Sequence, residues 1–179
     1  MTTFRKYTQI LDSLRAIISN MMILGIDPGT ARMGYSVMDV NDKSKKAKLV
    51  ETSVILTSSE LDMHKRLKVL YTELNSIVKK HIPRVMVIEK LFFNTNAKTA
   101  INVGQARGIS LLVAANSKMD VYEYTALEAK FALTGYGRAD KKEVQASVKK
   151  LLNLPEIIKS DDANDAVAIV LCHVKKSII

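Results

Sequence analysis

The sequence predicts an α/β fold in which a mixed five-stranded sheet is flanked by helices on both faces. Three strand-like runs come first, and two more then alternate with helical segments before the chain ends in helices. Short turns between the first three runs predict an antiparallel meander, whereas connections through helices predict parallel strands. Two runs, Ile23–Ile26 and Val85–Ile88, are continuously apolar. Such runs are typical of strands covered on both faces.

The amino-terminal half supplies the meander and one helix. Ile23–Ile26 ends at Asp27 and is followed by a Pro-Gly turn. Residues 33–40 and 48–56 are rich in β-branched side chains and predict two further strands, joined by a polar turn. A helix is predicted from Glu60 to His81 by apolar residues at helical spacing, namely Leu67, Leu70, Leu74, Ile77 and Val78.

The carboxy-terminal half supplies the parallel strands and the remaining helices. The strand Val85–Ile88 ends in a carboxylate, Glu89, as the first strand does. We then expect a helix over 97–117, a strand over 120–124, and helices over 125–133, 141–152 and 162–175.

The length of 179 residues suits one domain, which we place at residues 22–179. Residues 1–21 differ from the rest and are treated as an extension. Apolar side chains at helical spacing there are compatible with a short amphipathic helix. A genuine extension and a start codon assigned too far upstream both explain this segment. Asp12 and Arg15 interrupt any apolar stretch of the kind a secretory signal needs.

Composition narrows the class of protein. A hydrophobic fraction of 47% argues against wholesale disorder, and no window is apolar enough to span a bilayer. The net charge of +9 favours a polyanionic partner, with nucleic acid ahead of a membrane surface. The single cysteine, Cys172, excludes an intramolecular disulfide and a cysteine-based zinc site. We therefore expect a reduced, cytoplasmic protein.

Four acidic residues form the candidate site. Asp27 and Glu89 end apolar strands, and Asp162 and Asp165 share one face of a predicted helix. In open α/β sheets, functional residues gather at the carboxyl ends of strands. Like charges about 5 Å apart repel by roughly 3 kcal/mol at an effective dielectric of about 20, which a cation relieves. Carboxylate oxygens suit Mg²⁺ or Mn²⁺, and two such ions can hydrolyse a phosphodiester.

Each acid also has an ordinary structural explanation. Asp162, or its neighbour Asp161, can cap the last helix. Asp27 can form an Asx-turn before the Pro-Gly pair, and Glu89 can be a solvated strand end. Capping explains Asp165 poorly, because that residue lies one turn further into the helix.

Four motifs in register give the sequence a family resemblance. They are residues 25–35 (GIDPGTARMGY), 87–93 (VIEKLFF), 104–108 (GQARG) and 162–169 (DANDAVAI). Together they resemble the RuvC family of Holliday junction resolvases. The resemblance implies an RNase H-like fold and a homodimeric endonuclease that makes paired, symmetric nicks across four-way DNA junctions. It also implies a divalent metal requirement and cooperation with the RuvA–RuvB branch-migration machinery.

The same resemblance assigns roles to individual residues. Asp27, Glu89, Asp162 and Asp165 match the family's four acidic catalytic and metal-binding positions. Phe92 matches an aromatic residue that stacks on bases, while Lys130 and Lys141 match basic positions used for DNA and catalysis.

Further basic residues are candidates from their local context. Arg138 lies in a glycine-bearing turn before a helix that starts with Lys141 and Lys142, and such a start can seat a phosphate. A solvated charge run is the alternative. Arg107 can contact DNA or serve helix packing. The helix over 97–117, with its close-packing glycines, is our candidate for the dimer interface.

Three other functions compete with junction resolution. Another nuclease of the same fold with a different nucleic-acid substrate is the closest rival. A non-catalytic DNA-binding protein would lack one of the acids, yet none is missing. An ATPase related to actin or sugar kinases needs two related domains, for which the chain is too short.

Overall fold

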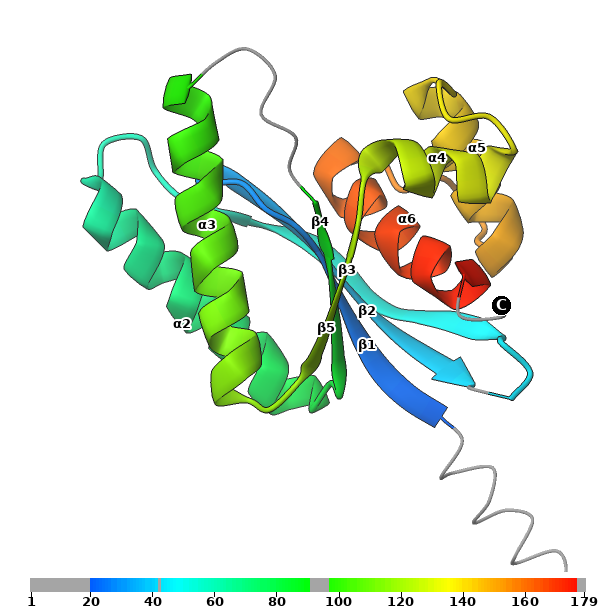
Figure 1. Cartoon of the computed structure of the whole chain (residues 1–179), viewed down its shortest axis with the longest axis horizontal. Coiled ribbons are helices and arrows are strands. Elements are labelled where there is room, and N and C mark those ends of the chain that lie inside the picture. Colours follow the sequence, from blue (N-terminus) through cyan, green and yellow to red (C-terminus); the bar gives the residue numbers. More distant parts are fainter. Residues whose placement is uncertain (1–19, 42, 91–96, 177–179) are drawn as a thin grey trace, which may run out of the picture.

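The computed structural model describes residues 20–41, 43–90 and 97–176. Its centre is one five-stranded sheet with the order β3-β2-β1-β4-β5 (Figure 1). The first three strands, β1 (Asn20–Asp27), β2 (Arg32–Asn41) and β3 (Ala47–Leu56), form an antiparallel meander. The other two, β4 (Val85–Glu89) and β5 (Asp120–Tyr124), run parallel to β1. The predicted mixed sheet is therefore confirmed.

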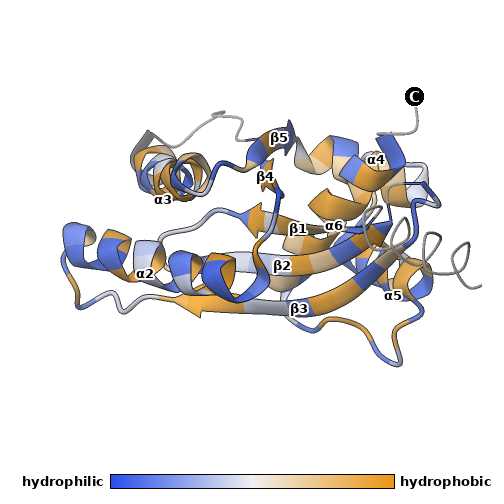
Figure 2. Ribbon diagram, turned by 90° about the horizontal axis from the view of Figure 1, so that it is seen from below, coloured by the Kyte–Doolittle hydropathy of each residue, from blue (hydrophilic) through white to orange (hydrophobic). Residues whose placement is uncertain are grey.

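Helices cover both faces of this sheet. On one side lie α2 (Met63–His81) and α3 (Ala97–Asn116). On the other lie α4 (Ala126–Thr134), α5 (Lys141–Leu152) and α6 (Asp161–Lys176) (Figure 1). In Figure 2, α2 alternates apolar and polar residues along its turns, as expected for a helix that buries one face. In the part of the chain that the structure describes, no helix has the length and apolar character to cross a membrane.

The helices on each face of the sheet enclose an apolar core, so the protein has two cores. The central strands β1 and β4 contribute alternate side chains to each of them. Ile23 and Val87 contribute to the core on the α6 side. Their neighbours Leu24, Ile26 and Ile88 contribute to the core on the side of α2 and α3. Because successive side chains of a strand point to opposite faces, the residue that follows Ile26 or Ile88 points toward α6.

The start of α6 is pressed directly onto the sheet. A Cβ atom added at Gly34 would lie 1.9 Å from the backbone oxygen of Asp162, and one at Gly25 would lie 2.2 Å from that of Ala166. The Ser36 hydroxyl also donates a hydrogen bond to the Ala166 carbonyl at 2.7 Å. Small residues on both sides thus let the backbone of α6 reach β1 and β2, and they fix where its first turn lies.

The starts of α4 and α5 are fixed by reciprocal capping boxes. Thr125 pairs with Glu128 at the start of α4, and Asp140 pairs with Glu143 at the start of α5. The second of these boxes places the beginning of α5 at Lys141, as the sequence predicts.

Candidate active site

Asp27 and Glu89 end the two central parallel strands side by side. The register pairs Ile26 with Ile88, so the acidic residues that follow them occupy equivalent positions. Both carboxyl groups point toward α6, because the preceding isoleucines belong to the opposite core. The two side chains lie within hydrogen-bonding reach of each other. The predicted convergence of two strand-end carboxylates is therefore present.

Helix α6 brings the other two acids to the same place. Burial and then the charges of Glu89, Asp165 and Asp162 together raise the pKa of Asp27 to about 8. Burial also raises the pKa of Glu89 and of Asp165, and the negative charge of Asp165 adds to the shift at Glu89. Desolvation and like charges both favour the neutral acid. The cluster therefore retains protons that separate carboxylates would release.

Asp162 differs from the other three acids because a cation already neutralises it. The Nε of Arg32 donates a hydrogen bond to its Oδ2 at 2.7 Å, and the Nη2 of Arg32 reaches the Ser160 hydroxyl at 3.5 Å. Asp162 does not cap α6. Instead, the Ser160 hydroxyl accepts from the amide of Ala163 at 3.5 Å, and the Ser160 carbonyl accepts from that of Asn164 at 2.9 Å.

The four acidic side chains suit a hard divalent cation, although they are not already arranged around one metal position. Among the described residues, no three acidic, histidine or cysteine side chains already surround a metal position. The donors are nevertheless carboxylate oxygens, and desolvation followed by the neighbouring negative charges raises the pKa of Asp27 to about 8. A divalent cation would replace such protons, and Mg²⁺ and Mn²⁺ prefer these ligands. The residues therefore fit a metal, with Asp162 turned away from Arg32.

Lys130 and Lys141 are cations that act on the acidic cluster, and Lys141 opposes the pKa shift of Asp165 more strongly than Lys130 does. Lys130 has the closer structural relation to Glu89. It lines a cavity of about 50 Å³ together with Glu89, Asp165 and apolar residues of α4, α5 and α6. Burial raises the pKa of Glu89 and of Asp165, whereas the charge of Lys130 acts against both shifts. A predicted DNA-contacting lysine thus stands beside two of the four acids.

Sequence comparison decides the family. The model for "Crossover junction endodeoxyribonuclease RuvC" matches residues 23–173. The chain belongs to the RuvC family. The RuvC protein of Halothermothrix orenii is 48% identical over 153 residues, which cover 86% of this chain and 92% of that protein. The RuvC protein of Desulforamulus reducens is 50% identical over 157 residues, covering 88% and 95%.

Solved structures agree with the RuvC assignment. RuvC from Thermus thermophilus, solved in complex with a Holliday junction substrate, has a TM-score of 0.80 and 32% identity, covering 86% of this chain and 92% of that one. The yeast mitochondrial Holliday junction resolvase Ydc2 shares the fold alone, with a TM-score of 0.64 at 13% identity. The predicted RNase H-like fold is thereby confirmed. Nucleases of the RuvC family are metal-dependent.

The other residues that we predicted to contact DNA lie in different parts of the structure. Lys141 lies on the surface and donates to Asp161 at 2.7 Å, an ion pair that raises its pKa. Arg138 and Lys142 are exposed beside it, in the turn before α5 and in its first turn. Arg107 lies on the opposite side of the sheet, where it pairs with Glu123 of β5, so the structure does not bring it to the acidic cluster. Phe92 lies outside the described residues.

Sequence reasoning missed Arg32. The predicted β1–β2 hairpin was enough to place Arg32 near Asp27. In this hairpin Asp27 lies opposite Gly34, which is only two residues from Arg32. A cation at the start of β2 therefore lies at the same edge of the sheet as the carboxylates. Nothing in the spacing, however, connects it to Asp162, from which it is separated by 130 residues.

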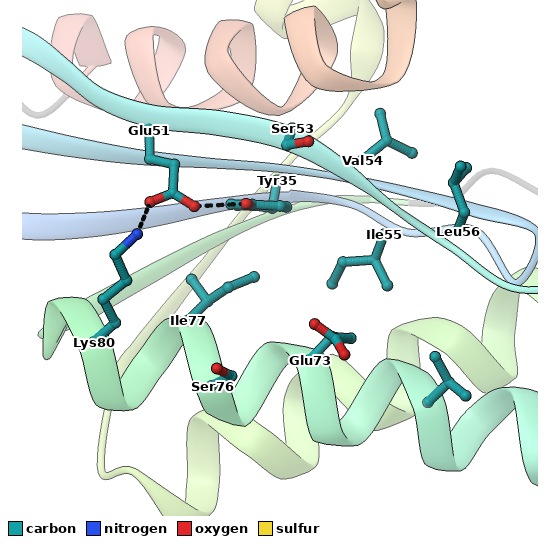
Figure 3. A pocket seen from close by; sticks show the side chains of 11 residues that line it. Tyr35, Glu51, Ser53, Val54, Ile55, Leu56, Glu73, Ser76, Ile77 and Lys80 are labelled. Atoms are coloured by element: carbon teal, nitrogen blue, oxygen red, sulfur yellow. Dashed lines mark hydrogen bonds and ion pairs between the residues drawn. The ribbon is translucent and has the colours of Figure 1, made fainter.

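A cavity of about 370 Å³ lies between β3 and α2, away from the four acids (Figure 3). The carboxylate of Glu51, at its edge, accepts hydrogen bonds from Tyr35 at 2.7 Å and from Lys80 at 2.5 Å, and it also bonds His81 at 2.9 Å. The bond from Lys80, followed by that from Tyr35, lowers the pKa of Glu51 to about 2. Its polar groups thus pair with one another, in contrast to the crowded acids near α6.

Proposed function

We propose that this chain is a crossover junction endodeoxyribonuclease, which resolves four-way (Holliday) DNA junctions by paired, symmetric nicks during homologous recombination and repair. The observation that carries the proposal is the partly buried acidic cluster at the carboxyl ends of β1 and β4, which α6 completes and Lys130 borders. Membership in the RuvC family and the junction-bound Thermus thermophilus relative support the choice of substrate.

We propose Asp27, Glu89, Asp162 and Asp165 as the catalytic and metal-binding residues. They would hold Mg²⁺, with Mn²⁺ as a substitute and two ions in each site. When bound, the ions supply a Lewis acid for the phosphate oxygens and a lowered pKa for the attacking water. All three of the other acids act on the pKa of Asp27, so Asp27 is our candidate for the ligand that the two ions share.

Basic residues of α4 and α5 would bind the DNA backbone around this site. Lys130 offers a positive charge beside Glu89 and Asp165, where charge builds up on the scissile phosphate. We propose that Lys141 exchanges Asp161 for a phosphate and that Arg138 and Lys142 extend the contact. The positive end of the α5 helix dipole favours an anion in the same place, beside the Asp140–Glu143 capping box.

Two further residues, Phe92 and Arg107, are candidates for the DNA interface. We propose that Phe92 stacks on bases near the junction centre, which is worth about 1–3 kcal/mol per base. Arg107 remains a candidate DNA contact. Its pairing with Glu123 supports the alternative we considered for it, packing of α3 against β5.

The test of the proposal compares three substrates of matched sequence: a four-way junction, a linear duplex and an RNA–DNA hybrid. Each is incubated with Mg²⁺, with Mn²⁺ and with chelator. We expect nicks in the junction alone, and only with metal. Cleavage of the hybrid or of the duplex in place of the junction would instead indicate a nuclease of the same fold with a different substrate.

We further propose a homodimer formed through α3. A four-way junction has near two-fold symmetry, so a two-fold dimer offers one active site to each of two strands. The exposed side of α3 carries Ile101 and Leu112, which are 63% and 48% exposed. Gly104 and Gly108 lie between them with open space above their Cα atoms. This apolar, small-residue face is suited to a second copy of the same helix.

Sedimentation measurements test the dimer. Ile101→Lys should convert the protein to a monomer, whereas Leu127→Lys, at a site on α4 that is 61% exposed, should leave the dimer intact. A dimer that survives Ile101→Lys would place the interface elsewhere.

We also propose cooperation with the RuvA–RuvB branch-migration complex, in the cytoplasm where chromosomal DNA is available. Residues 22–179 would form the nuclease domain and residues 1–21 an extension, of which Asn20 and Met21 lengthen β1. Deleting residues 1–19 tests the division, because the shortened chain should fold and cut junctions normally.

A further inference from the structure

Arg32 is the first residue of β2 and reaches across to the first turn of α6. Its guanidinium binds the Asp162 carboxylate at 2.7 Å and approaches the Ser160 hydroxyl at 3.5 Å. The side chains of Arg32 and Asp162 are 53% and 28% exposed, so the pair lies at the rim of the acidic cluster. Solvent therefore reaches the arginine, and the arginine side chain has room to move.

The backbone around Asp162 has no comparable freedom. Gly34 lies beneath it so closely that even a Cβ atom would approach the Asp162 carbonyl carbon to 2.4 Å. The Ser36 hydroxyl anchors the same helix one turn further along, through Ala166. Asp162 can therefore approach the other acids only by turning its side chain, and the ion pair with Arg32 opposes that rotation.

We propose that Arg32 is a positioning residue for the nuclease reaction, because it competes with the metal for the carboxylate of Asp162. In the metal-free protein it neutralises Asp162 and holds it at the rim, which leaves Asp27, Glu89 and Asp165 as the crowded group. Metal binding exchanges the guanidinium for the cation at Asp162. The inference rests on the proposed function, in which Asp162 is a metal ligand.

This competition differs from a general electrostatic effect. Any cation near the cluster weakens metal binding through its charge, whether or not it contacts a ligand. Arg32 also acts through one specific partner, so the part of its effect that exceeds charge alone must disappear when Asp162 can no longer form an ion pair. Lys159, an exposed cation just before α6, provides the matched control for charge alone.

Binding of Mn²⁺ to the full chain, followed by electron paramagnetic resonance of the free ion, tests the inference without DNA. An exposed ion pair is worth about 0.2–1 kcal/mol, so Arg32→Gln should lower the Mn²⁺ dissociation constant by roughly 1.5–5-fold. Arg32→Lys keeps the charge but loses the planar fork and should give a smaller decrease. Lys159→Gln should give less change than Arg32→Gln, and in an Asp162→Asn background Arg32→Gln should change the constant no more than Lys159→Gln does.

Three results would overturn the inference: an unchanged constant in Arg32→Gln, an increased constant, or the same decrease in the Asp162→Asn background. An increase would mean that Arg32 holds Asp162 in a geometry that favours metal. Failure of the proposed function looks different, because then the wild-type chain would bind no Mn²⁺, or Asp27→Asn would bind it equally well. Thermal unfolding of each variant verifies that it is folded.

Discussion

Replacing Asp27 by Asn should stabilise the metal-free protein at neutral pH. The amide has nearly the shape of the carboxyl group but never ionises. Wild-type Asp27 lies among Glu89, Asp165 and Asp162, and its pKa rises from 3.8 to about 8. The native state therefore binds a proton that the unfolded chain has already released. Wild-type stability must then fall as the pH rises between these two values.

The magnitude follows from the size of this shift. Each pKa unit corresponds to about 1.4 kcal/mol, so the full difference sets an upper bound of roughly 5 kcal/mol at pH 7.5. Asp27 shares its proton with Glu89, so part of this energy belongs to the pair. We therefore expect a gain of about 1–3 kcal/mol, or about 2–12 °C in Tm for a chain of this length. The gain should be much smaller near pH 4, where about two-fifths of the unfolded carboxyl groups are themselves protonated.

Thermal unfolding in chelator at pH 4.5, 6 and 7.5 measures the effect. Asp120→Asn, at the exposed start of β5, is the matched control and should show no such trend. Adding Mg²⁺ should then stabilise the wild-type protein but not Asp27→Asn. The cation binds the native state and offsets the repulsion between the carboxylates only when all of its ligands are present. An Asp27→Asn variant that is less stable than wild type at pH 7.5 in chelator would refute the reasoning.

Three further predictions concern cleavage, binding and packing. Asp27→Asn should abolish junction cleavage while junction affinity in a gel-shift assay stays within about threefold, because the basic surface is intact; parallel loss of both would contradict this division. Lys130→Ala should weaken junction binding and reduce the slope of log affinity against log salt by about 1, whereas an unchanged slope would remove Lys130 from the phosphate contacts. Gly34→Ala should destabilise the fold by about 3 kcal/mol or more, because its Cβ would meet the Asp162 backbone; a denaturation midpoint equal to that of the wild type would disprove the contact.

The sheet and its helices were predictable because the local patterns agree with the tertiary structure. Continuous apolar runs become β1 and β4, which are covered on both faces, and the β-branched runs become the meander. The carboxyl ends of neighbouring parallel strands must meet, so Asp27 and Glu89 were predictable as a pair. The three-residue spacing of Asp162 and Asp165 was sufficient to place them on one face of α6.

The contacts between these acids and their cations were not predictable in the same way. The pairing of Arg32 with Asp162 depends on how far α6 sinks onto Gly34, which is a matter of packing and not of local pattern. The basic motif likewise predicts Lys141 at a helix start but not its ion pair with Asp161. Local sequence determines which elements form, whereas these partners follow from the seating of α6 on the sheet.

The most direct test of the proposed nuclease maps the nicks in a four-way junction that is labelled in turn on each of its four strands. We predict metal-dependent nicks at symmetric positions in two opposed strands, with ends that a ligase can rejoin, and none in any strand with Asp27→Asn. Nicks at unrelated positions in single strands, or cutting that persists in Asp27→Asn, would contradict a paired resolvase built on this acidic cluster.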